Sequence, residues 1–208
     1  MDDPSFLTFD ALLREAYVRP EAGEEIRRRY ETRAAILVSD FTGMVKRTDA
    51  DGIIYALSLA RHVEDLMASA FSAEDGQIVK AVADTIFVVF RDPSAALRAA
   101  LEAQARVHRF NHGRTGRYGD GTRSDPIHAC MGLGFGDALV IPGQNLYGPE
   151  VNRAFVLGED VAEGEEVLVT EAFLAAHGPL PEGVGSFIAP AERRTHAGFP
   201  FHVVRDYR

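Results

Sequence analysis

The sequence has little cysteine and lysine and no long apolar run. Cys130 is the single cysteine, so a disulfide framework within the chain is excluded and a reducing compartment is compatible. No window approaches 18 consecutive apolar residues, which argues against a membrane-spanning helix. The acidic start MDDPSFLTFD lacks the basic stretch that opens a signal peptide. We therefore expect a cytoplasmic protein with no membrane partner.

Positive charge is also scarce. Lys and Arg number 22 against 31 Asp and Glu, for a net charge of −9, and Lys46 and Lys80 are the two lysines. Duplex nucleic acid and anionic membranes reward a basic surface, so neither is expected as the main partner. A nucleotide is compatible, because divalent cations bridge carboxylates to phosphates. The length of 208 residues suits one domain with a small appendage.

Several common site motifs are absent. The Gly- and Arg-rich loop 112–126 lacks Gly-Lys-Ser/Thr, so it is not a P-loop. The histidines show no HExxH spacing and there is no CxxC pair, which argues against a zinc site. The acidic stretch 158–166 lacks the alternating ligands of a calcium loop, and we interpret it as a surface turn.

Hydrophobic periodicity divides the chain into a helical extension, residues 1–33, and a domain, residues 34–208. The expected elements of the domain are a strand at 34–40, a helix at 49–71, strands at 77–82 and 85–90, a helix at 92–111, a hairpin around Gly136-Asp137, a short helix within 148–162, a strand at 165–170, a helix at 171–177 and late strands at 185–190 and 199–208. The order β, α, β, β, α, β predicts an α+β sandwich of the ferredoxin-like kind with extra strands.

Two carboxylates fall at strand ends in this arrangement. Asp40 ends the first strand, and Asp84 stands between two apolar runs in IVKAVADTIFVVF. The first strand of such a sheet lies beside the central hairpin, so the two side chains should converge. Taken singly, each Asp punctuates a turn, which Asp favours. Taken together, they indicate a site for divalent cations, because a shared cation removes the repulsion between them.

Four blocks of the sequence then carry a family likeness. AAILVSDFTGM, IVKAVADTIFVVF, IHACMGLGFGDALV and YGPEVNRAFVLGEDVAEGEEVLVTEAF occur in this order between about residues 34 and 176. In order and spacing they resemble the blocks of class III nucleotide cyclases, the adenylate and guanylate cyclase catalytic domains. The resemblance implies the fold expected above and a head-to-tail dimer whose active sites lie at the interface.

The resemblance also assigns the metal half of the site. Asp40 and Asp84 match the metal ligands of the family, and the backbone carbonyl of Phe41 matches the ligand beside the first of them. It implies two Mg²⁺ or Mn²⁺ ions per site. Thr42 and Gly43, in the same turn, are expected to bind substrate.

The nucleotide half follows from the same resemblance. Lys80 matches the residue that contacts the purine edge, and Asn152 matches the Asn that orients the ribose and the reacting phosphate. Asn145 stands where the family has an Asp that pairs with adenine, and an amide both donates and accepts whereas a carboxylate accepts. The choice among adenine, guanine and pyrimidine therefore stays open.

A second departure concerns catalysis. Val156 stands where the family places a transition-state Arg, whose loss costs about 10³–10⁵ in the rate of phosphoryl transfer. Arg153 points roughly 100° away around a helix and does not simply replace it. The substitutes that remain are Arg193, Arg194 or an Arg of the loop 112–126.

These residues lead to two main hypotheses. The first is an active cyclase that converts a nucleoside triphosphate to a 3′,5′-cyclic nucleotide and pyrophosphate by a two-metal mechanism. The second is a catalytically impaired cyclase-like module that acts as a regulatory or dimerisation partner, as Val156 and Asn145 favour. A homodimer and a heterodimer both fit. A nucleic-acid polymerase palm shares a two-carboxylate layout, but the net charge of −9 argues against it.

Overall fold

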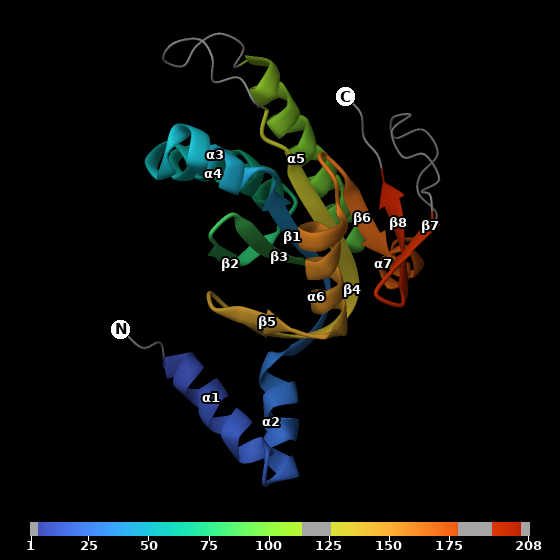
Figure 1. The fold of residues 1–208 in the computed structure, drawn as a ribbon. Coiled ribbons are helices and arrows are strands. Elements are labelled where there is room, and N and C mark those ends of the chain that lie inside the picture. The colour runs from blue at the N-terminus through green and yellow to red at the C-terminus, as the bar shows by residue number, and fades with distance from the viewer. Residues whose placement is uncertain (1–3, 114–125, 179–192, 205–208) are drawn as a thin grey trace.

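A computed structural model of the chain describes residues 4–113, 126–178 and 193–204 (Figure 1). The helices are α1 (Pro4–Ala16), α2 (Pro20–Tyr30), α3 (Met44–Asp51), α4 (Ile53–Ala73), α5 (Pro93–Gly113), α6 (Pro149–Val156), the π-helical turn η1 (Leu157–Val161) and α7 (Glu171–His177). The strands are β1 (Glu31–Phe41), β2 (Gln77–Val82), β3 (Thr85–Phe90), β4 (Ala129–Ile141), β5 (Asn145–Tyr147), β6 (Val167–Thr170), β7 (Arg193–His196) and β8 (Phe199–Val204).

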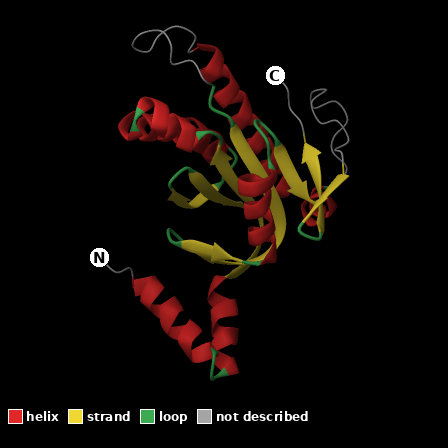
Figure 2. Cartoon of the chain, in the orientation of Figure 1, coloured by secondary structure: helices red, strands yellow, loops and turns green. Residues whose placement is uncertain are grey.

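A single eight-stranded sheet organises the described part of the chain. Its order is β2-β3-β1-β4-β6-β8-β7, with β5 paired to β4. β1 lies between β3 and β4 and runs antiparallel to both. This is the arrangement of a ferredoxin-like core, so the predicted α+β class is confirmed. Figure 2 shows the helices on both sides of the sheet.

The larger core lies between the sheet and helices α4 and α5. Alternate residues of β1, among them Ala35 and Leu37, face this side because successive strand side chains point to opposite faces. Val63 and Met67 of α4 are fully buried against them. The remaining positions of β1, such as Ile36 and Val38, form a second cluster under α6. Both faces of β1 are therefore buried, which explains its nearly continuous apolar sequence.

Glycines on β4 allow α6 and η1 to lie directly on the second face. A Cβ atom added at Gly132 would stand 2.1 Å from the carbonyl oxygen of Ala154, and one at Gly134 would stand 2.7 Å from that of Glu150. No larger residue fits at either position without movement of the backbone. The glycines of this strand therefore serve close packing of a helix.

This packing overturns the predicted hairpin around Gly136-Asp137. β4 continues without interruption from Ala129 to Ile141. The chain reverses instead at 142–144, where Gly143 adopts the left-handed conformation at φ 72°, and returns as β5. The sequence predicts a turn at Gly136, whereas this glycine makes room for α6, because a Cβ atom there would stand 2.9 Å from Cγ of Glu150.

Other boundaries differ more modestly. The first strand begins at Glu31, directly after α2, rather than at 34. The helix expected at 49–71 is divided into α3 and α4 by Gly52, which has a φ of 84°. The strand expected at 185–190 lies outside the described residues. No described helix is long and apolar enough to cross a membrane.

The helical extension shares a small hydrophobic cluster with the end of β4. α1 and α2 form an antiparallel pair below β5 in Figure 1. Phe9 of α1 and Ile26 of α2 are buried with Ile141 at the end of β4. Phe9 also contacts the ring of Tyr30 edge-on, with centroids 5.2 Å apart. The extension is therefore packed against the far end of the β4–β5 hairpin.

Candidate active site

The structure brings Asp40 and Asp84 to the same end of the sheet. Ser39 of β1 pairs with Ile86 of β3, so Asp40 lies opposite the start of β3. Ala83 and Asp84 form the two-residue turn between β2 and β3, and Ala83 has a φ of 56°. A left-handed alanine is strained, and such strain collects at functional sites.

Negative charge accumulates around Asp40. Burial, the carboxylate of Glu159 and, more weakly, the carboxylate of Asp84 raise the pKa of Asp40 from 3.8 to about 7. The backbone N–H of Phe41 donates to the carboxylate and acts in the opposite direction. The carboxylates of Asp40, Glu159 and Asp84 thus repel one another in the folded chain. A bound cation would reduce this repulsion.

The turn after Asp40 is held by the start of β4. The backbone N–H of Thr42 donates to the carbonyl oxygen of His128 at 2.9 Å. Gly43 follows in the left-handed conformation at φ 82° and is the N-cap of α3. Phe41 itself is buried in the larger core. The turn that carries the predicted metal and substrate residues is therefore anchored at both sides.

Lys80 lies on β2, opposite Phe87 of β3, at a register shift between Ile78 and Lys80. Its Nζ atom stands 4.2 Å from the centroid of the Phe87 ring, which contributes a cation–π contact. The ring of Phe87 is in turn stacked on Phe155 of α6. Partial burial lowers the pKa of Lys80.

Asn145 begins β5, and its amide is bonded locally. Its Oδ1 atom accepts from the backbone N–H of Leu146 at 3.0 Å, and its Nδ2 atom donates to the hydroxyl of Tyr147 at 2.8 Å. β5 and β2 contact each other, and Leu146 shares a buried cluster with Val79. The structure thus places Asn145 on the strand that packs against the strand of Lys80.

Asn152 and Val156 are one turn apart on α6. Asn152 is exposed and Val156 is half-buried. Arg153 is directed elsewhere, because its guanidinium donates to Glu150 and stands 5.9 Å from the ring centroid of Phe199. Among the other arginines that the sequence offered as substitutes, Arg194 pairs with Glu166 at 3.7 Å. The side chain of Arg193 and the arginines at 114, 117 and 123 lie outside the described residues.

Comparison with known proteins gives one kind of match. No family model and no curated protein matches the chain. Among solved structures, the guanylyl cyclase Cya2 is 19% identical with a TM-score of 0.65, over 85% of this chain and 91% of that one. The adenylyl cyclase CyaB from P. aeruginosa is 19% identical with a TM-score of 0.62, over 86% and 97%. A bacterial light-regulated adenylyl cyclase is 16% identical with a TM-score of 0.66, over 84% and 92%.

The chain has the fold of adenylyl and guanylyl cyclase catalytic domains. Matches of this coverage confirm the expected architecture. At identities of 13–24% among the similar structures, they establish the fold alone. The matches therefore assign no role to individual residues of this cyclase fold, and such roles are inferred from the geometry of the site.

Sequence reasoning missed Glu159, which belongs to η1 of the cyclase fold. The stretch 158–166 was interpreted as a surface turn, but Glu159 accepts a hydrogen bond from the hydroxyl of Thr85 and faces Asp40. Gly158 makes this approach feasible, because a Cβ atom there would stand 2.7 Å from the carbonyl oxygen of Val38. A glycine before a glutamate carries no signal of this contact in the sequence.

The donor set fits a hard divalent cation. Two carboxylates, Asp40 and Asp84, and the backbone oxygen of Phe41 are oxygen ligands of the kind that Mg²⁺ and Mn²⁺ prefer. Within the described ranges, no three His, Cys, Asp or Glu side chains are arranged to hold a metal ion. A cation in this cyclase fold would therefore complete its coordination with water or with the phosphates of a substrate.

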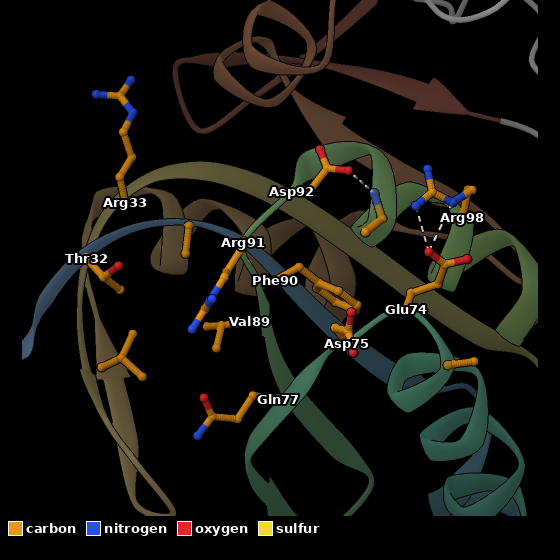
Figure 3. Close-up of a pocket in the computed structure, with 14 residues that line it drawn as sticks. Thr32, Arg33, Glu74, Asp75, Gln77, Val89, Phe90, Arg91, Asp92 and Arg98 are labelled. Atoms are coloured by element: carbon orange, nitrogen blue, oxygen red, sulfur yellow. Dashed lines mark hydrogen bonds and ion pairs between the residues drawn. The ribbon is translucent and has the colours of Figure 1, made fainter.

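A cavity of about 830 Å³ lies elsewhere, at the opposite end of β1 and β3 (Figure 3). Thr32, Arg33, Gln77 and Arg91 are among its lining residues, and Arg98 at its edge is bonded to Glu74. None of the predicted site residues lines it. The cavity is therefore separate from the end of the sheet that carries Asp40 and Asp84.

Proposed function

We propose that this chain is a nucleotide cyclase. It converts a nucleoside triphosphate to a 3′,5′-cyclic nucleotide and pyrophosphate, as a bond forms between the ribose 3′-oxygen and the α-phosphorus while the bond to the β-phosphate breaks. The observation that carries the proposal is the meeting of Asp40 and Asp84 at one end of a cyclase-type sheet, where burial and then the carboxylates of Glu159 and Asp84 raise the pKa of Asp40 to about 7.

Each half of the site has a separate task in this proposal. Asp40, Asp84 and the Phe41 carbonyl hold two Mg²⁺ or Mn²⁺ ions, which when bound lower the pKa of the 3′-hydroxyl and neutralise the charge that develops on the phosphates. Thr42 and Gly43 position the phosphates beside the start of α3. The base is contacted by residues of β2 and β5.

Strand register supports a dimeric active site. Asp40 pairs with Cys130, and Asn145 pairs with Ile141, eleven residues further along β4. At about 3.3 Å per residue, the two positions are separated by roughly 36 Å of strand. We therefore propose a head-to-tail dimer in which the metal half of one chain faces the Lys80, Asn145 and Asn152 half of a second copy, in the cytoplasm. A heterodimer would bring the same two halves of the site together in the same way.

A second candidate function has its own observation. Val156 offers no charge to the transition state, and Arg153 is occupied by Glu150. A chain without a transition-state arginine is slow unless another Arg replaces it. A regulatory cyclase-like module that binds nucleotide without turnover would keep the same cations and the same dimer.

Incubation of the purified protein with Mn²⁺ and each of ATP, GTP, CTP and UTP tests the two candidates. An active cyclase yields a cyclic product with at least one nucleotide, and Asp40→Ala abolishes it. Asp65→Asn, a substitution of an exposed carboxylate on α4, serves as the matched control and should leave the rate unchanged. Absence of product with all four nucleotides supports the regulatory module. Product that survives Asp40→Ala contradicts the role of the metal half.

A further inference from the structure

The π-helical turn η1 is seated directly against β1. Its first residue, Leu157, is fully buried, and the backbone N–H of Ala162 closes the turn by donating to the Leu157 carbonyl at 2.8 Å. A Cβ atom at Gly158 would stand 2.7 Å from the carbonyl oxygen of Val38, so no side chain separates the turn from the strand. The next residue, Glu159, therefore has a fixed backbone position beside the end of β1. Short π-helical turns of this kind are frequent at functional sites.

The carboxylate of Glu159 is directed toward the strand ends that carry Asp40 and Asp84. It accepts a hydrogen bond from the hydroxyl of Thr85, which is 8% exposed and directly follows Asp84 in the chain. The register of β1 and β3 places Thr85 opposite Asp40. One buried hydroxyl thus positions Glu159 beside both of the predicted metal ligands.

The three carboxylates share this end of the sheet without a basic partner among the described residues. No Lys, Arg or His of the described ranges forms an ion pair with Asp40, Asp84 or Glu159. Glu159 also has a larger effect than Asp84 on the pKa of Asp40, so it acts on the Asp40 carboxylate at close range. Its charge is therefore directed at the position that a cation would occupy.

Mg²⁺ and similar hard cations keep several waters when protein carboxylates hold them. A further carboxylate beside the ligands accepts hydrogen bonds from these waters, and outer groups of this kind add to the affinity for the metal. We infer that Glu159 is a positioning residue of the metal half, which holds the water shell of a cation bound by Asp40 and Asp84. This inference rests on the proposed function and adds a residue to which the family resemblance assigns no role.

Titration of the purified, metal-free protein with Mn²⁺ tests this role without turnover. The free hydrated ion has an electron paramagnetic resonance signal that is lost when the ion binds. Glu159→Gln keeps an oxygen that accepts from Thr85 and removes the charge, so the dissociation constant for Mn²⁺ should rise about 10-fold or more. The matched control Asp160→Asn removes the same charge from the neighbouring, exposed position of η1 and should leave the dissociation constant nearly unchanged.

The stability of the metal-free protein separates this role from a purely structural one. Without a cation, the charge of Glu159 opposes the charge of Asp40, so Glu159→Gln should unfold at a higher urea concentration than the wild type at pH 8. If Glu159 served only to fix η1 through Thr85, Glu159→Gln would be equally or less stable and would bind Mn²⁺ as the wild type does. Opposite changes in metal-free stability and Mn²⁺ affinity therefore support the inference.

Thr85→Val isolates the hydroxyl that positions Glu159. This variant retains all three charges and loses the hydrogen bond to Glu159. The dissociation constant for Mn²⁺ should rise about 2- to 10-fold, the range expected from one hydrogen bond. Thr85→Ser retains the hydroxyl and should restore the affinity of the wild type.

The outcomes separate this inference from the proposed function. Mn²⁺ binding that Glu159→Gln does not weaken, or that Asp160→Asn weakens equally, overturns the role of Glu159 and leaves the cyclase proposal standing. An unchanged affinity in Thr85→Val overturns the positioning of Glu159 by the Thr85 hydroxyl. A wild type that binds no Mn²⁺, with or without a nucleoside triphosphate, overturns both the inference and the proposed function.

Discussion

Replacement of Asp40 by asparagine keeps the size of the side chain and removes its charge. The substitution therefore tests whether burial and the neighbouring carboxylates disfavour the charged form of Asp40, as the structure indicates. Asp40 has an ordinary pKa of 3.8 when exposed and a pKa of about 7 in the folded chain, chiefly because of burial and Glu159. A difference of about three pH units corresponds to roughly 4 kcal/mol at 1.36 kcal/mol per unit, as an upper value. Asp40 remains partly open to solvent, so screening reduces the expected effect to about 1–2 kcal/mol.

The sign follows from proton linkage. The folded state binds the Asp40 proton more tightly than the unfolded state does, so the wild type loses stability as pH rises from about 4 to 7. Below pH 4 the carboxyl is protonated in both states, and no difference from asparagine is expected. Above pH 7 it is charged in both states, and the penalty is complete. Asp40→Asn should therefore be more stable than the wild type by about 1–2 kcal/mol at pH 8.

Urea denaturation at pH 4, 6 and 8 measures this difference. The exposed control Asp65→Asn should change the free energy of unfolding little at any of these pH values. Mn²⁺ added at pH 8 should stabilise the wild type and not Asp40→Asn, because only the wild type retains both carboxylates. If Asp40→Asn is less stable than the wild type at pH 8 without metal, the claim that burial and neighbouring carboxylates disfavour the charged form of Asp40 is refuted.

Three further predictions concern single positions. Glu150 is 6% exposed and accepts from the Thr170 hydroxyl at 2.6 Å and from Arg153, so Glu150→Ala should lower the free energy of unfolding by about 3 kcal/mol in a urea titration; no loss would show that these bonds do not stabilise the fold. Ala83→Gly removes the strain of a left-handed alanine next to Asp84 and should raise the free energy of unfolding by about 0.5–1 kcal/mol. A decrease in the free energy of unfolding would contradict this strain. Val156→Arg, one turn from Asn152, should raise the rate of cyclisation by about 10-fold or more in the four-nucleotide assay; an unchanged rate would mean that another group already supplies this charge.

The sequence was sufficient for the part of the fold that local pattern controls. The apolar run before Asp40 and the tight turn at Asp84 predicted three strands and their meeting point, because strand alternation and turn chemistry are read from neighbouring residues. The prediction of a hairpin at Gly136-Asp137 was wrong, because a glycine that forms a turn and a glycine that lets a helix pack closely look the same in the sequence. Whether it bends the chain or admits a helix depends on what lies above it.

The candidate site divides in the same way. Asp40 and Asp84 were placed by sequence, whereas Glu159 became visible only when η1 was seen against β1. The hydrogen bond from the Asn145 amide to the Tyr147 hydroxyl also escaped the sequence, because the Tyr147 ring is stacked on Phe9 of another helix. Contacts between distant segments carry no local pattern that a single sequence reveals.

The glycine contacts between β4 and α6 have a mechanical consequence. With the backbone of Gly132 seated against the carbonyl of Ala154, there is no compressible layer of side chains between strand and helix at this point. Asn152 therefore travels with the sheet as part of one stiff unit. In the dimer that we propose, any change in the distance between the two halves of the site would therefore arise at the junction between the two chains.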